Sequence, residues 1–146
     1  MIIVDEKIIE DMDLAREVLT KNNYSIVVVK NGNVLIKKDG DVIRSTLDAI
    51  EELKEEIQDS IVGDRILGKA SALLYRYSKI KGVYSTQATK TAIAVLIIAG
   101  IPIQIDEMIP YIKNRDGSDV CPFEKMLLNI DSPEEAHVIL KEKILR

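Results

Sequence analysis

The chain has 146 residues, 47% hydrophobic and 30% charged, which is enough for one domain with a single core. Its net charge of -4 and its lack of Trp argue against nucleic acid as the main partner, because a phosphate backbone needs a basic face and bases need aromatic platforms. A single Cys excludes an internal disulfide and suits a reducing compartment.

Neither a signal peptide nor a membrane span is expected. Asp5 and Glu6 interrupt the apolar start of the chain almost at once. The longest apolar run, Ala92 to Ile103, contains Gly100 and Pro102 and is too short to cross a bilayer. We therefore expect a cytoplasmic protein without membrane partners.

The first part of the chain predicts a helix, a hairpin and a second helix. Apolar residues recur at helical spacing over 5–22, and again over 45–58. Between them, Asn31-Gly32-Asn33 separates two β-branched runs at 25–29 and 34–38, which is a strong hairpin pattern.

The middle of the chain predicts short strands that alternate with helices. A strand at 60–62 is expected to turn tightly at Gly63-Asp64, and Thr86 is expected to cap the second of these helices. Helix-length connections imply right-handed crossovers and a parallel core, so the sheet with its hairpin is mixed. The remaining expected elements are a helix at 67–77, a strand at 82–85, a helix from 86 to 99 and a strand at 102–105.

The last part of the chain predicts two more helices. Cys121-Pro122 opens a short one after a polar turn at 114–119. Ser132, with Pro133 and Glu135 behind it, is a helix N-cap, and this helix runs to the end. No linker interrupts the chain, so residues 1–146 form one domain, with 1–22 as an N-terminal helical extension.

Gly63 to Lys69 has the G-x-x-x-x-G-K spacing of a phosphate-binding loop between a strand and a helix. The next residue would have to be Ser or Thr to hold magnesium, and it is Ala70. A nucleoside-triphosphatase loop is therefore not expected. Lys69 near a helix N-terminus can still attract an anion, and an equally good interpretation is that Gly68 serves close packing and Lys69 is solvated.

Two other features have a chemical and a structural interpretation. The polar turn at 114–119 lacks the spacing of a calcium loop, and Arg115 in it either binds an anion or ties the turn to acidic neighbours. Cys121 lies near a helix start, where a thiol can be activated, but the one His of the chain, His137, lies on the expected C-terminal helix beside apolar neighbours. Buried packing is the simpler interpretation of Cys121.

Gly68-Lys69-Ala70 with Ala72-Leu73-Leu74, and Asn114-Arg115-Asp116-Gly117 with Cys121-Pro122 and Glu124, carry a family resemblance. The chain from Tyr24 onward resembles domain-of-unknown-function family 1893, a family of small, uncharacterised prokaryotic proteins grouped with the cytidine-deaminase-like fold. The resemblance implies an α/β protein, a three-layer α/β/α sandwich around a five-stranded mixed sheet, with extra N- and C-terminal helices. It implies strands three, four and five starting near Ser60, Lys81 and Pro102.

Zinc deaminases of that fold need three His or Cys ligands and a neighbouring Glu at two helix starts. One Cys and one His cannot supply three ligands from one protomer, so neither a metal nor another cofactor is expected. The resemblance nevertheless places a pocket where two helix N-termini converge. The candidate ligand-binding residues are Asp64, Arg65, Gly68, Lys69, Thr86, Thr89, Asn114, Arg115, Asp116 and Cys121.

The sequence therefore favours a metal-independent binding protein for a small anionic or nucleotide-like ligand at the C-terminal edge of the sheet. Two alternatives stay open: an enzyme without zinc that uses Lys69, Asp64 or Cys121, and a structural protein that assembles through the apolar helix at 92–98. A homo-oligomer is compatible with each of them. No catalytic residue can be assigned.

Overall fold

The computed structural model describes residues 4–145. A five-stranded sheet with the strand order β2-β1-β3-β4-β5 forms its middle layer. β1 pairs antiparallel with β2 and with β3, while β3, β4 and β5 are parallel, so the expected mixed sheet is confirmed. The strands are β1 (Ile26–Lys30), β2 (Asn33–Lys38), β3 (Ile61–Leu67), β4 (Gly82–Thr89) and β5 (Ile103–Ile109).

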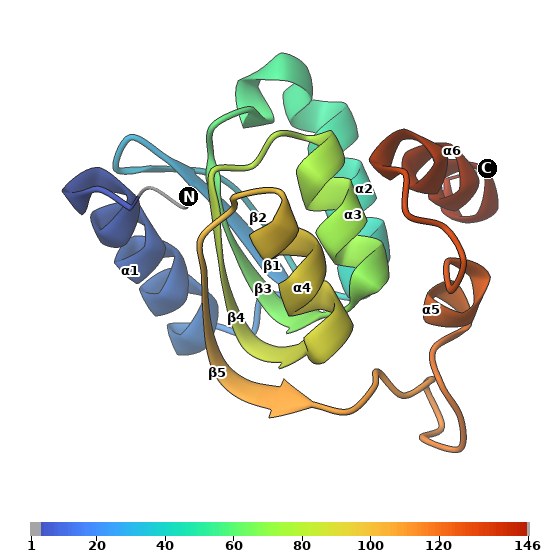
Figure 1. Ribbon diagram of the computed structural model, residues 1–146. Helices are drawn as coiled ribbons and strands as arrows, with labels where there is room; N and C mark the ends of the chain where they lie inside the picture. The colour runs from blue at the N-terminus through green and yellow to red at the C-terminus, as the bar shows by residue number, and fades with distance from the viewer. Residues whose placement is uncertain (1–3, 146) are drawn as a thin grey trace.

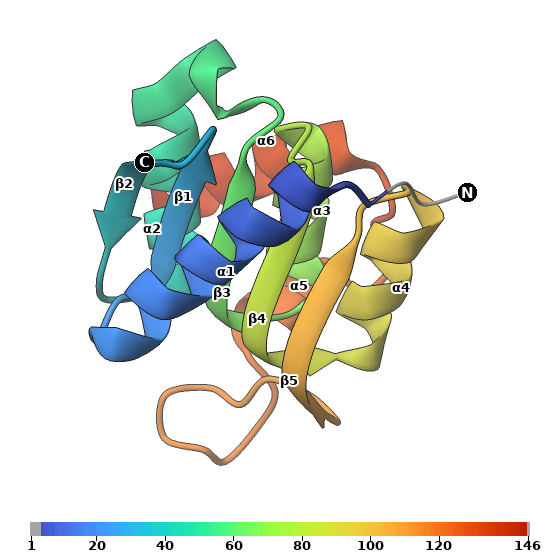
Figure 2. The same cartoon turned by 90° about the vertical axis from the view of Figure 1, so that its left-hand side faces the viewer.

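Helices cover both faces of the sheet, which gives the α/β/α arrangement (Figure 1). One face carries α1 alone, which crosses β1, β3 and β4 (Figure 2). The other face carries α2, α3 and α4, and α6 packs on the outer side of α3. The helices are α1 (Glu6–Lys21), α2 (Val42–Leu53), α3 (Lys69–Tyr77), α4 (Lys90–Ile98), α5 (Pro122–Met126) and α6 (Pro133–Ile144), with a 3-10 turn, η1, at Lys54–Ile57.

Two hydrophobic cores lie on the two faces of the sheet. The larger core joins the sheet to α2, α3, α4 and α6, and the smaller one joins Ile8, Met12, Ala15 and Leu19 of α1 to the opposite face. α1 therefore forms a whole layer of the domain. Within residues 4–145, no helix combines the length and the apolar character that crossing a membrane requires.

The predicted hairpin is confirmed. Asn31 and Gly32 form its two-residue turn, and both have positive φ angles, 52° and 78°. A turn of this hand matches the twist of the flanking strands, and Asn-Gly tolerates it best. The predicted N-cap Ser132 is also confirmed, because its hydroxyl accepts a hydrogen bond from the backbone N–H of Glu135 at 3.2 Å.

The expected turn at Gly63-Asp64 is wrong, because both residues lie inside β3. Gly63 pairs with Val27 on one side and Tyr84 on the other. A Cβ at Gly63 would lie 3.1 Å from the carbonyl oxygen of Ala15, so this glycine allows α1 to pack closely on the sheet. The residues with phosphate-loop spacing are therefore extended as far as Leu67.

Other element boundaries also differ from those expected. β4 continues through Thr86 to Thr89, and Thr89 is the N-cap of α4, its hydroxyl oxygen accepting from Ala92 N–H at 3.2 Å. α2 begins at Val42, since Asp41 caps it, and it gives way to η1 at Lys54. Pairing with β4 carries β5 to Ile109, four residues past its expected end. Pairing with a neighbouring strand thus extends a strand over residues whose own sequence does not clearly favour strand or turn.

Candidate functional site

A cavity of about 720 Å³, the larger of two at this edge of the sheet, lies at the carboxyl end of β3. One side is formed by Asp41, Val42 and Ile43 at the start of α2, together with Ile66 near the end of β3. The other side belongs to the stretch between β5 and α6, residues 110–131, which we call the α5 segment. It contributes residues 112–116 and 121–124.

The wall of this cavity is mainly apolar, but cations and carboxylates lie around it. Lys113 and Arg115 are exposed, and their side chains form no hydrogen bond or ion pair with residues 4–145. All three carboxylates are engaged. Asp41 accepts from Ile43 N–H at 3.1 Å, Asp116 accepts from Ser118 N–H at 2.9 Å, and Glu124 binds the start of α3. The two cations are therefore the charged side chains at this cavity that have no partner among the described residues, while the three carboxylates keep their negative charges.

The polar turn that carries Arg115 is closed by its own hydrogen bonds. The N–H of Asn114 donates to the carbonyl of Asp119 at 2.8 Å, and the N–H of Gly117 donates to the carbonyl of Asn114 at 3.0 Å. Asp119 also pairs with the ammonium of Lys125. Asn114 and Asp116 thus shape the turn, while the guanidinium of Arg115 stays available.

The N-terminus of α3 is occupied by a carboxylate from within the chain. Glu124 accepts a hydrogen bond from Lys69 N–H at 2.8 Å and another from Ala70 N–H at 2.9 Å. These are two of the amides that a helix leaves unpaired at its start and that attract anions. The anion expected at this helix end is thus supplied by the protein itself.

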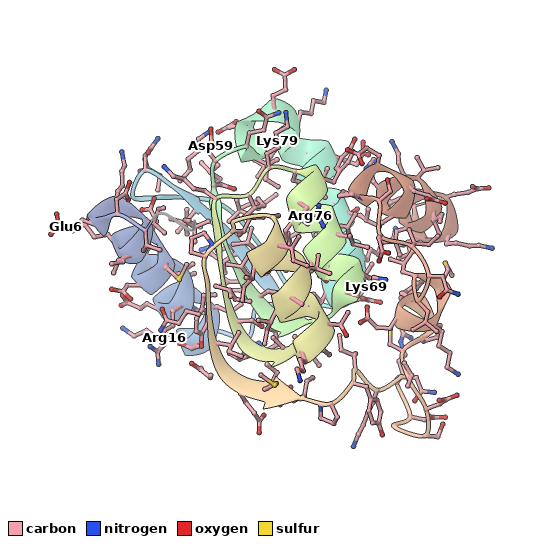
Figure 3. The ribbon with its side chains drawn as sticks, viewed as in Figure 1. Glu6, Arg16, Asp59, Lys69, Arg76 and Lys79 are labelled. Carbon is pink, nitrogen blue, oxygen red and sulfur yellow. The ribbon has the colours of Figure 1, made fainter. Side chains whose placement is uncertain are left out.

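Lys69 points away from the cavity of about 720 Å³. Its ammonium donates to the carbonyl of Leu128 at 3.1 Å and pairs with Asp131 at 3.0 Å, and the side chain is buried. Figure 3 shows Lys69 at the end of α3 that lies beside α5. It lines a smaller cavity of about 310 Å³ together with Thr89. Ile112 and Glu124 line both cavities.

Asp64 and Arg65 of β3 serve the interior of the fold. The carboxylate of Asp64 is fully buried and accepts hydrogen bonds from the hydroxyl of Tyr75 and, at 2.8 Å, from Ile66 N–H. Burial raises the pKa of Asp64 to about 7, although both hydrogen bonds favour the charged form. The guanidinium of Arg65 donates to backbone carbonyls at the end of α1 and just beyond, those of Leu19, Asn22 and Tyr24.

The two threonines also have structural partners. The hydroxyl of Thr86 donates to the carbonyl of Arg65 across the β3–β4 pair. Thr89 caps α4, and its side chain is buried beside the smaller cavity. The structure thus brings Asn114, Arg115, Asp116 and Cys121 together around one cavity. Lys69 and Thr89 line the smaller cavity instead, and the side chains of Asp64, Arg65 and Thr86 form contacts within the fold.

The imidazole of His137 is not placed to act as a base for Cys121. It is partly buried at the start of α5, which is held at the first residues of α3 by Glu124. The ring of His137 stacks on Tyr77, the last residue of α3, with 4.0 Å between the centroids. A helix of nine residues is roughly 13 Å long, so the thiol and the imidazole are associated with opposite ends of α3.

A zinc ion does not fit the residues present at the helix starts. α3 begins Gly68-Lys69-Ala70 and α4 begins Thr89-Lys90, and none of these side chains is a thiol, an imidazole or a carboxylate. Within residues 4–145, no group of three or more His, Cys, Asp or Glu side chains could hold a metal ion. No reaction step through a metal follows from this arrangement.

Sequence reasoning missed several residues that line the larger cavity. Lys113 and Glu124 were not candidates, nor were Ile66 and the start of α2. Glu124 lies in the first turn of α5, two residues after Pro122, where acidic residues are common. The local sequence therefore explains an acidic residue at this position but does not indicate its contact with α3. The partners of Glu124 lie 54 and 55 residues away in the sequence, so no local pattern indicates them.

Comparison with known proteins identifies relatives that cover most of the chain. A family model described as a domain of unknown function (DUF1893) matches residues 14–144. The crystal structure of a DUF1893 family protein from Thermotoga maritima is similar with a TM-score of 0.82 and 24% identity, over 97% of this chain and 93% of that one. No curated protein matches the chain.

Weaker structural similarity extends to two other solved structures. A dCMP deaminase from the cyanophage S-TIM5 has a TM-score of 0.48 and 18% identity, over 73% of this chain and all of that one. RibD from Acinetobacter baumannii has a TM-score of 0.48 and 16% identity, over 69% of this chain and 36% of that one.

Proposed function

Because this chain belongs to the DUF1893 family, whose description assigns no activity, we propose its function from the geometry of the larger cavity. This cavity binds a small molecule that has an apolar body and an anionic group. The observation that carries this proposal is the arrangement of charged side chains around the cavity. Lys113 and Arg115 are unpaired, whereas Asp41, Asp116 and Glu124 are already hydrogen-bonded.

The size and lining of the cavity support a ligand with an apolar body. Its volume of about 720 Å³ falls within the range of roughly 300–1,000 Å³ that small-molecule pockets occupy. Val42, Ile43 and Ile66 form the apolar surface on the sheet side, and Ile112 and Phe123 face them from the α5 segment. Phe123 adds an aromatic ring, which favours a planar group such as a nucleobase.

Unpaired cations at the margin of an apolar cavity favour a ligand whose negative charge stays near water. Arg115 presents a planar guanidinium that can hold a carboxylate or phosphate through two parallel hydrogen bonds. Lys113, two residues away, adds a second positive charge. A nucleoside monophosphate or a similar aromatic anion satisfies both requirements, and its anionic group need not displace Glu124 from α3.

A thermal-shift screen tests this proposal. The probes are four nucleoside monophosphates, adenosine and inorganic phosphate, each with wild type, Arg115→Ala and Lys7→Ala. The last variant removes one positive charge from exposed α1 and serves as the control. A ligand at one hundred times its dissociation constant stabilises by about 2.7 kcal/mol, which is a rise of about 5–10 °C for this size.

We expect a nucleoside monophosphate to raise the melting temperature of wild type and of Lys7→Ala, and to have a much smaller effect on Arg115→Ala. Adenosine alone and phosphate alone should each give less than the monophosphate, because each meets only part of the cavity. The absence of a shift with every monophosphate, or equal shifts in all three proteins, would contradict the proposal.

An assembly function is the second candidate, and the surface of α4 favours it. This helix is apolar on all sides apart from Lys90 and Thr91, yet only Ala92 and Leu96 are buried. Ile98 is 79% exposed and Ile97 is 47% exposed. A helix that is hydrophobic all round is normally covered, and a second copy of the chain offers the same uncharged surface.

A further inference from the structure

We propose that the α5 segment, residues 110–131, is a lid that opens and closes the larger cavity, with Glu124 as the contact that holds it shut. The segment supplies most of the lining residues of that cavity, and the body of the domain supplies only Asp41, Val42, Ile43 and Ile66. The cavity therefore exists in this form only while the segment lies against the N-terminus of α3.

Few interactions attach the segment to the rest of the fold. Of residues 110–131, Leu127 alone has a buried side chain, and α5 is only five residues long. Phe123 and Ile130 are half-buried against the core. A stretch with so little buried apolar surface belongs to the part of a protein that opens at low free-energy cost. Both ends are fixed, by β5 on one side and by the buried Ala136 and Leu140 of α6 on the other.

The polar attachments of the segment converge on the first residues of α3. Glu124 accepts from the backbone N–H groups of Lys69 and Ala70, and the ammonium of Lys69 holds the carbonyl of Leu128 and the carboxylate of Asp131. Hydrogen bonds to charged groups are stronger than neutral ones, so these contacts hold the closed state together with the buried side chain of Leu127. Release of Glu124 removes two of them at once.

Ile112 and Glu124 separate the two cavities at this edge of the sheet, because both side chains line both cavities. If they withdraw, the spaces of about 720 Å³ and about 310 Å³ become continuous and the start of α3 is uncovered. Movement of one short segment therefore changes access to the whole edge.

Gly68 leaves room for the ends of the Glu124 and Ile112 side chains in the closed position. A Cβ there would approach Glu124 and Ile112 to less than the 3.0 Å that real Cβ atoms keep. Gly68 itself has φ -115° and ψ -175°, an extended conformation that alanine adopts without strain. Gly68→Ala therefore acts on the lid through contact alone and leaves the backbone of the N-cap unaltered.

The use of this lid as an entrance rests on the proposed function, but its motion can be measured without any ligand. Cys121 is the only cysteine of the chain, lies in the segment and is partly buried, so the rate at which its thiol reacts reports on opening. The measurement uses a disulfide reagent of the dithionitrobenzoate type on the folded, full-length protein. Hydrogen exchange at the amides of Lys69 and Ala70 gives a second readout.

Three variants are compared with wild type. Gly68→Ala obstructs closure from the body of the domain, and Glu124→Gln keeps the size of the side chain but loses its charge and one acceptor oxygen. Glu10→Gln makes the same charge change on exposed α1, on the other face of the sheet. We expect Cys121 to react at least tenfold faster in the first two variants and at the wild-type rate in the third. Hydrogen exchange at the amides of Lys69 and Ala70 should also accelerate in the first two variants, while the amides of Leu73 and Leu74 stay protected.

Equal thiol reaction rates in all four proteins, with unchanged exchange at Lys69 and Ala70, would overturn the proposal. Loss of protection along the whole of α3 in both variants would also overturn it, because the segment would then open only when the domain unfolds. Since no ligand is present, neither result depends on the ligand screen, and failure of that screen would leave the lid intact.

Discussion

The hydroxyl of Tyr75 donates a hydrogen bond to the carboxylate of Asp64, and both side chains are buried between α3 and β3. The same hydroxyl lies 3.3 Å from the hydroxyl of Thr46 on α2. Burial raises the pKa of Asp64 to about 7 and raises that of Tyr75 well above its usual value of 10.0. Asp64, Tyr75 and Thr46 thus link α2 and α3 to β3, and the free-energy cost of burying Asp64 depends on pH.

We predict that Asp64→Asn removes a pH dependence of stability. Between pH 3.8 and pH 7 the folded protein holds a proton at Asp64 that the unfolded chain has lost, so stability falls as pH rises through this window. The full effect is on the order of 4 kcal/mol above pH 7. Asparagine stays neutral and can keep both hydrogen bonds, because Tyr75 can turn its own hydrogen toward Thr46.

Urea unfolding of wild type and Asp64→Asn at pH 4.5 and pH 7.5 checks this prediction. Asp64→Asn should gain stability relative to wild type on going from the lower to the higher pH. The same difference between the two proteins at both pH values would show that Asp64 does not titrate in this range.

His137 should contribute the opposite slope. Burial, assisted by the charge of Lys141, lowers the pKa of His137 below its usual 6.5, while Glu51 partly opposes this. The unfolded chain then binds more protons than the folded protein below pH 6.5, so stability is lost as pH falls. We predict that His137→Phe, which keeps a ring against Tyr77, gains stability relative to wild type when the pH drops from 7 to 5. Calorimetry at both pH values measures this, and parallel changes in the two proteins would contradict it.

Two arginines should differ sharply in their effect on stability. We predict that Arg65→Lys lowers the free energy of unfolding by roughly 2–3 kcal/mol, because one ammonium cannot replace the fork that binds three carbonyls near the end of α1. Arg115→Ala should change it by less than about 0.5 kcal/mol, because this guanidinium is exposed and unpaired. Urea unfolding of both variants tests this prediction. Equal losses in the free energy of unfolding would show that Arg115 supports the fold.

The exposed face of α4 predicts association of the chain with itself. Sedimentation velocity at micromolar concentration should show wild type as a dimer or larger, and Ile98→Lys as a monomer. The control is Val138→Lys, which places the same charge on α6 at a residue that is 61% exposed, and it should sediment like wild type. A wild-type protein that is monomeric at every concentration would rule out this interface.

Much of the fold was predictable, because its elements have local causes. Asn31-Gly32 specifies a two-residue turn through positive φ angles, and Ser132 specifies a helix start through its hydroxyl. Apolar residues at helical spacing in α1 predicted both a helix and its buried face. Boundaries were less predictable where a residue suits two conformations. Gly63 resembles a turn residue but lies in β3, and Thr86 resembles a cap but lies in β4.

The candidate site was predicted only in part. Arg115 and Cys121, with Asn114 and Asp116, do lie around one cavity, while Lys69 points away from it into the contact with Asp131. Asp64 is a polar residue at the centre of the sheet, and its burial results from Tyr75 on α3 and Ile26 on β1 lying beside it.

The sequence by itself determined what depends on composition and on near neighbours: an α/β fold with a hairpin before its parallel strands, and too few His and Cys residues for a zinc site within one chain. The tertiary structure alone decided what lies at the N-terminus of α3. Glu124 reaches Lys69 and Ala70 across more than fifty residues, and Gly68 leaves room for it. A contact of this kind depends on how α5 folds back over the sheet edge, and no periodicity or local preference encodes such a path.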